Sequence, residues 1–114
     1  MNENRNTNAY PIHILRENLR AEAGRLSEKL NRSVNRLTSA DAQPCTEYGE
    51  EVLNQRSLCE RLMYLQYCRN ALERCIAGKN AHLRYRWQDG SVTVTRFRKC
   101  GPNRVDVRGM QKCA

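Results

Sequence analysis

Apolar residues are scarce in this sequence, and none of its apolar segments is long. Hydrophobic residues make up 39% of the 114 residues, below the roughly 45–50% of typical globular chains, a range that includes glycine. We therefore expect a small core, or one completed by a partner. No segment approaches the roughly 18 apolar residues of a membrane helix, and the polar start MNENRNTNAYPIHIL lacks the pattern of a secretory signal. These absences predict a cytoplasmic protein without membrane contact.

Residues that build catalytic sites are few or scattered. Only His13 and His82 are histidines, and neither has a serine or cysteine nucleophile at a recognisable spacing. The six glycines are scattered, so a glycine-rich phosphate loop is absent. Glu47, Glu50 and Glu51 are explained by favourable positions near the positive end of a helix. We predict that the protein is not an enzyme and carries no cofactor.

The cysteines fit neither a zinc site nor a set of disulfides. Structural zinc sites usually take two ligands from a C-x2–4-C turn, and no two cysteines are that close in this sequence. Cys68 and Cys75 lie about 10.5 Å apart along one predicted helix, beyond the roughly 7 Å that a disulfide spans. We predict no metal and free thiols that act as small buried hydrophobes. Cys100 and Cys113 flank a predicted strand and would come closest to each other.

Two long segments have apolar residues at steps of three and four, which predicts helices. The first begins at Pro11, a residue that suits the first turn of a helix. Its stripe comprises Ile12, Leu15, Leu19, Ala23, Leu26, Leu30, Val34 and Leu37. After a connector at residues 39–44, Thr46 is a predicted N-cap of a second helix that ends near Ala77, before Gly78.

The second helix has a broad apolar surface. Its main stripe is Leu58, Leu62, Leu65, Leu72 and Ile76. A second strip on another side comprises Tyr48, Val52, Cys59 and Met63. Such a surface needs more than one neighbour. The first helix and the C-terminal segment can supply this cover, and the alternative is a homodimer through the helices.

The pattern changes to alternation in residues 82–97, on both sides of Asp89-Gly90. This dipeptide is typical of a two-residue β-hairpin turn. In that register Trp87 faces Val92, Tyr85 faces Val94 and Leu83 faces Arg96. The predicted apolar face comprises Leu83, Tyr85, Trp87, Val92 and Val94. The predicted opposite face comprises His82, Arg84, Arg86, Thr93, Thr95 and Phe97. Residues 104–108 are a candidate third strand.

Positive charge is concentrated in the last third of the chain. Residues 79–114 contain nine Lys/Arg and two Asp, a net charge of +7, whereas residues 1–78 have a net charge of only +1. A nearly neutral scaffold with one basic region indicates a surface that binds an anionic partner.

These features predict an α+β protein with a long antiparallel helical hairpin followed by a small antiparallel β-hairpin or three-stranded sheet. We expect a disordered arm at residues 1–10 and a single domain at residues 11–114. Within the domain, residues 11–78 form the helical hairpin and residues 79–114 the basic β region, which packs its Leu83/Tyr85/Trp87 side on the second helix.

The predicted function is that of a small accessory protein that binds DNA or RNA. The predicted contacts are phosphate binding or base stacking by Arg84, Arg86, Arg96, Arg98, Lys99, Arg104, Arg108 and Phe97. The alternative is an adaptor or inhibitor, of the kind that phages or mobile elements encode, that docks its basic face on an acidic surface of a larger enzyme.

Overall fold

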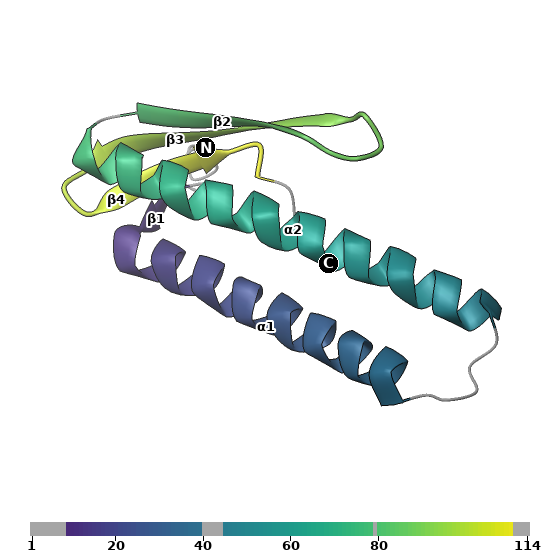
Figure 1. The fold of residues 1–114 in the computed structure, drawn as a ribbon. Coiled ribbons are helices and arrows are strands. Elements are labelled where there is room, and N and C mark those ends of the chain that lie inside the picture. The colour runs from purple at the N-terminus through teal and green to yellow at the C-terminus, as the bar shows by residue number, and fades with distance from the viewer. Residues whose placement is uncertain (1–8, 40–44, 79, 111–114) are drawn as a thin grey trace, which may run out of the picture.

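A computed structural model describes residues 9–39, 45–78 and 80–110. In chain order the elements are β1 (Ala9–Pro11), α1 (Ile12–Ser39), α2 (Cys45–Ala77), β2 (Asn80–Arg86), β3 (Val92–Gly101) and β4 (Arg104–Arg108). The helices form an antiparallel hairpin, and the strands form one antiparallel sheet of order β1-β4-β3-β2 that packs on the helices (Figure 1). The α+β class and the helical hairpin are confirmed.

The two helices pack through the predicted apolar stripes. Leu15, Leu19 and Leu26 of α1 are buried against a row of buried α2 residues. Ion pairs fix the antiparallel alignment near both ends of the hairpin. Arg16 donates to both carboxylate oxygens of Glu73 at 2.8 and 2.7 Å, and Arg36 donates to Glu51 at 3.2 and 2.9 Å.

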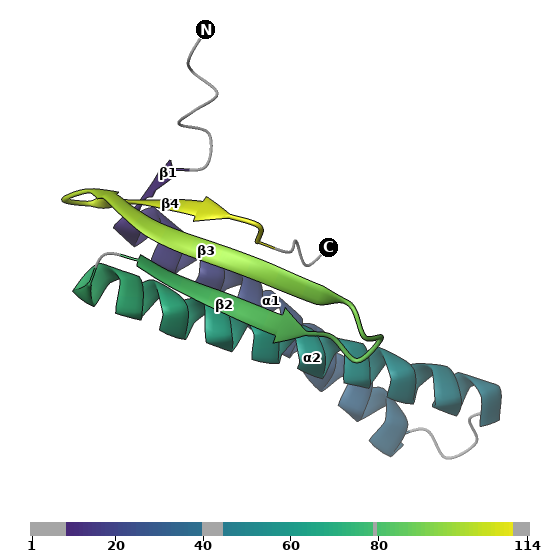
Figure 2. The same ribbon diagram turned by 90° about the horizontal axis from the view of Figure 1, so that it is seen from above.

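The helical hairpin is longer than the sheet. The molecule measures 56 × 30 × 27 Å, and the sheet covers the start of α1 and the second half of α2 (Figure 2). Beyond the sheet the helices pack on each other, and some apolar side chains are exposed there, among them Val34 at 40% and Leu53 at 64%.

The sheet has four strands because β1 joins it from before the helices. Ala9, Tyr10 and Pro11 pair with Asp106, Val105 and Arg104. The prediction of a disordered arm was wrong for Ala9 and Tyr10, and residues 1–8 lie outside the described part. Pro11 ends an edge strand instead of starting the helix, a position where a missing N–H is tolerated.

The register of the β2–β3 hairpin differs by one residue from the prediction. Trp87 donates its backbone N–H to Ser91 at 2.9 Å, and Gly90 donates to Trp87 at 2.9 Å. The loop therefore comprises residues 88–90, with Gly90 at a φ of 92°, as in three-residue hairpins. Arg86 now opposes Val92 and Tyr85 opposes Thr93.

A shift of one residue moves every side chain of a strand to its other face. Val92 and Val94 were predicted to be in the core, but both point away from the helices and are 39% exposed. Phe97 was predicted on the outward side, but it points to the helices and is 1% exposed. Thr93 and Thr95 share its inward side.

An aromatic cluster holds the sheet to α2. The ring centroids of Tyr64, Tyr85 and Trp87 lie 4.7–5.5 Å apart, which is normal for edge-to-face or tilted aromatic contacts. The inward threonines bond to this cluster. Tyr64 bonds to Thr95 at 2.8 Å, and Trp87 Nε1 donates to Thr93 at 2.8 Å.

The four cysteines whose side chains the structure describes fall into two buried and two exposed residues. Cys68 and Cys75 are buried in the core, as predicted for small apolar residues, and burial raises the pKa of the Cys75 thiol. Cys59 and Cys100 are exposed, contrary to that prediction. None of these four is in a disulfide; Cys113 and the side chain of Cys45 lie outside the described residues. Within the described part of the chain, neither helix is apolar enough over a sufficient length to cross a membrane.

Candidate functional site

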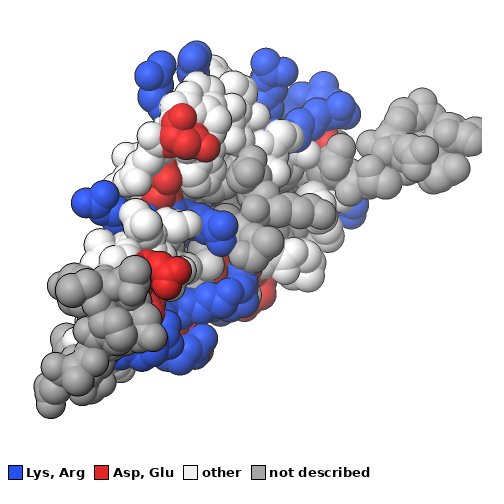
Figure 3. All heavy atoms as spheres, turned by 90° about the vertical axis from the view of Figure 1, so that its right-hand side faces the viewer, with Lys and Arg blue, Asp and Glu red and all other residues white. Residues whose placement is uncertain are grey.

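Five arginines project from the side of the sheet that faces away from the helices. Strand alternation places them there together with His82, Val92 and Val94. We call this set the basic face: it comprises Arg84, Arg86, Arg96, Arg98 and Arg108, all of which are exposed. In Figure 3, where the sheet lies along the top, basic side chains project from this side, whereas both signs mix over the helices.

Four of these arginines keep their charge uncompensated. Arg84, Arg86, Arg96 and Arg98 form no ion pair with a carboxylate of the described residues. The fifth, Arg108, donates Nε to Asp106 Oδ2 at 3.0 Å. Asp106 is the single acidic residue in the four strands and is 7% exposed. The basic face therefore presents a strong positive charge to solvent.

Of the other three residues predicted to bind the partner, Phe97 and Lys99 turn toward the helices, and Arg104 is engaged within the sheet. Phe97 is in the core, so the prediction that it stacks on a base from the outward side is wrong. Lys99 has the same inward orientation and lies near Cys75, toward the end of α2. Arg104 donates Nη2 to the backbone oxygen of Ala9 at 3.0 Å, which ties β1 to the sheet.

The basic face carries no Phe, Tyr or Trp side chain. Tyr85, Trp87 and Phe97, the aromatic residues of β2, β3 and the hairpin, all turn toward the helices. Apart from the imidazole of His82, the face therefore supplies guanidinium groups without a ring on which a base could stack.

A strip of α2 beside β2 is also left uncovered. Met63 is 54% and Tyr67 45% exposed, and Cys59 is exposed one turn earlier; we call these three residues the side strip. A groove of about 510 Å³ separates Cys59 and Met63 from the edge of β2 at Tyr85 and Arg86. The sequence predicted this apolar strip, although not Tyr67, and the side chain of Tyr48 lies outside the described residues.

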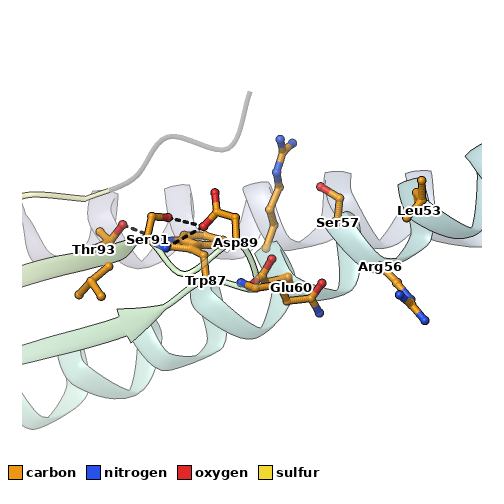
Figure 4. Close-up of a pocket in the computed structure, with 11 residues that line it drawn as sticks. Leu53, Arg56, Ser57, Glu60, Trp87, Asp89, Ser91 and Thr93 are labelled. Atoms are coloured by element: carbon orange, nitrogen blue, oxygen red, sulfur yellow. Dashed lines mark hydrogen bonds between the residues drawn. The ribbon is translucent and has the colours of Figure 1, made fainter.

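A second cleft of about 630 Å³ lies where the hairpin loop approaches α2 (Figure 4). In the loop, Asp89 accepts hydrogen bonds from the backbone N–H and hydroxyl of Ser91 at 2.8 and 2.6 Å, and these bonds lower the pKa of Asp89. Arg56 points away from the loop in Figure 4. Across residues 9–39, 45–78 and 80–110, no three His, Cys, Asp or Glu side chains gather as metal ligands would.

Comparison with protein-family models, curated proteins and solved structures finds no match to this chain.

Proposed function

We propose that the protein binds nucleic acid by placing the phosphate backbone on the basic face. The observation that carries this proposal is the group Arg84, Arg86, Arg96 and Arg98, which shares one open face and has no carboxylate partner among the described residues. Arginine guanidinium groups form two parallel hydrogen bonds with a phosphate, which makes them efficient phosphate ligands.

The spacing of these arginines suits several phosphates at once. Residues two apart on a strand are separated by about 6.6 Å, and neighbouring strands by about 4.8 Å. Arg96 lies opposite His82 and Arg98 opposite Asn80. The four arginines therefore form a row of about 20 Å along the hairpin, from Arg86 and Arg84 on β2 to Arg96 and Arg98 on β3. Since the face has no Phe, Tyr or Trp side chain, it favours backbone contacts over base stacking, and we expect little sequence preference.

The test is the binding of a labelled mixed-sequence DNA duplex, followed by fluorescence anisotropy at several salt concentrations. Four phosphate contacts predict a slope of about −3.6 in log K against log salt, or a loss on the order of 100-fold between about 50 and 200 mM. The variant Arg84→Glu/Arg86→Glu should abolish binding. The charge-matched variant Arg20→Glu/Arg32→Glu, on the exposed surface of α1, should bind nearly as tightly as the parent protein.

Salt-insensitive binding, or an equal loss in both double variants, would refute the proposal. The same measurement with an RNA duplex distinguishes the two nucleic acids, because the A-form groove changes the spacing of the phosphates that the face meets.

A second candidate function is docking of the basic face on an acidic protein surface. Val92 and Val94 favour it, because each is 39% exposed and sits directly opposite Arg86 or Arg84. Apolar side chains among arginines are common at protein interfaces. If this alternative holds, a stoichiometric protein partner survives nuclease treatment of an extract, and Arg84→Glu/Arg86→Glu releases it.

A further inference from the structure

Strand β2 is a long edge of the sheet, and no described residue pairs on its outer side. Its seven residues pair only with β3, and it runs along α2 at the margin of the sheet (Figure 2). Trp87 bonds to Ser91 across the hairpin, and antiparallel ladders alternate bonded and non-bonded pairs. The backbone N–H and C=O groups of His82, Arg84 and Arg86 therefore point to the open side.

The side strip lies directly beneath this open edge. The Tyr67 ring is 5.9 Å from the ring of Tyr85, and Met63 borders the groove that reaches Tyr85 and Arg86. An additional strand on β2 would therefore cover exposed apolar surface with its inward side chains. Its outward side chains would lie beside Arg84 and Arg86, whose charges no described carboxylate neutralises.

We propose that the open edge of β2 binds an extended peptide segment of a partner protein, in which acidic and apolar residues alternate. The peptide backbone pairs with His82, Arg84 and Arg86 as a fifth strand. The acidic residues lie on the side of the basic face, and the apolar residues cover Met63 and Tyr67.

A second copy of this chain is a poor occupant of the same edge. Pairing two β2 strands in antiparallel fashion would bring Arg84 and Arg86 of both copies together on one face, and like charges on paired strands are destabilising. The uncompensated charge thus selects an acidic segment.

This inference goes beyond the proposed function, because it concerns backbone pairing at an edge and not phosphate contacts on a face. The two surfaces share the side chains of Arg84 and Arg86, so a bound acidic segment should compete with nucleic acid.

The experiment uses a fluorescent peptide as long as β2, with Glu and Val at alternate positions, and measures its binding by anisotropy. The variant His82→Pro removes one N–H from the open side, where proline is tolerated in an edge strand. His82→Ala removes the same imidazole and keeps that N–H. We expect His82→Pro to lose about tenfold in affinity or more, whereas His82→Ala stays close to the parent protein.

Circular dichroism shows whether His82→Pro folds. If it does not, two further measurements still test the inference. A peptide of identical composition with its Glu residues in one block should bind at least about tenfold more weakly. Met63→Glu, which places a negative charge in the path of the peptide, should also weaken binding. The inference is overturned if the alternating peptide does not bind, if the block peptide binds equally, or if Met63→Glu has no effect.

The experiments distinguish failure of the nucleic-acid proposal from failure of the peptide-binding inference. A folded His82→Pro protein should bind the DNA duplex like the parent protein, because every arginine of the basic face remains. Loss of DNA binding in the parent protein with intact peptide binding would refute the proposed function and support the inference.

Discussion

Tyr64 of α2 and Thr95 of β3 share a hydrogen bond of 2.8 Å between their hydroxyl oxygens, and both side chains are fully buried. The Thr95 hydroxyl also donates to the backbone oxygen of Gly109 at 3.3 Å. The Tyr64 hydroxyl is then the donor to Thr95. This chain of bonds links α2, the middle of the sheet and the segment after β4.

The first prediction concerns the Tyr64 hydroxyl. Tyr64→Phe removes it from a buried bond, and we expect the free energy of unfolding to fall by about 1 kcal/mol. The control is Tyr67→Phe, since the Tyr67 side chain is 45% exposed and its change should cost less than about 0.5 kcal/mol. Urea unfolding followed through the single tryptophan, Trp87, measures both. Equal effects of the two substitutions would contradict the role given to the Tyr64–Thr95 bond.

The second prediction concerns two glycines with positive φ. Gly90 has a φ of 92° and open space where a Cβ would lie, whereas at Gly109, with a φ of 77°, a Cβ would lie 2.2 Å from the backbone oxygen of Val94. Gly90→Ala meets only backbone strain, of about 1–2 kcal/mol. Gly109→Ala adds a clash with backbone and should destabilise by clearly more. Thermal unfolding of the two variants side by side checks this order, and a milder effect at Gly109 would contradict it.

The helices were predictable because their apolar stripes are long. The stripes predicted helices from Pro11 to about Leu37 and from Thr46 to about Ala77, and the observed helices are Ile12–Ser39 and Cys45–Ala77. Strand β1 gave no comparable signal. Three residues are too few to show alternation, and the partner strand β4 comes from the other end of the chain.

The predicted hairpin register was wrong because it rested on local signals alone. Asp89-Gly90 suits a two-residue turn. Val92 and Val94 are more hydrophobic than Thr93 and Thr95, so the face with the valines was predicted to be buried. Phe97 lies on the same face of β3 as Thr93 and Thr95. A large aromatic residue at that position indicated that this face, and not the face of Val92 and Val94, is buried. Burial of Phe97 and the hydrogen bonds that Tyr64 and Trp87 donate to the threonine hydroxyls favour the observed pairing.

The same shift decides the composition of the candidate site. Arg84 and Arg86 project outward in either register. Arg96 and Arg98 join them only in the observed one, because the predicted pairing placed Arg96 opposite Leu83 on the apolar side. Lys99 turns inward for the same reason. Sequence reasoning thus identified the basic segment, whereas the grouping of its charges depended on tertiary packing.

The third prediction concerns the buried carboxylate on the basic face. Arg108→Ala leaves Asp106, which is 7% exposed, without its cation, and we expect a loss of about 1–3 kcal/mol in the free energy of unfolding. Arg96 lies opposite Arg108 and is exposed, so Arg96→Ala should stay within about 0.5 kcal/mol. Adding Asp106→Asn to Arg108→Ala should restore part of the loss. Urea unfolding at neutral pH compares the variants, and equal stability of the two alanine variants would argue against the prediction.

The last prediction concerns pH and the far end of the helical hairpin. Glu51 accepts hydrogen bonds from Arg36 and from the buried hydroxyl of Ser33, and these two partners lower the pKa of Glu51 from 4.5 to about 2. The folded protein therefore binds this proton less readily than the unfolded chain. The stabilisation from Glu51 is fully present above pH 4.5 and is lost as the pH falls through about 2.

Glu51→Gln isolates this contribution, because the amide keeps the shape of the side chain and does not titrate in this range. The difference in stability between the parent protein and Glu51→Gln should be largest near neutral pH and shrink as the pH falls below 4.5. Glu50→Gln is the matched control, since Glu50 is an exposed neighbour, whereas the bonds from Arg36 and Ser33 go to Glu51. Urea unfolding at a series of pH values measures both. A Glu51→Gln difference that is constant with pH, or that grows toward acid, would show that the Glu51 carboxylate does not stabilise the helical hairpin through Arg36 and Ser33.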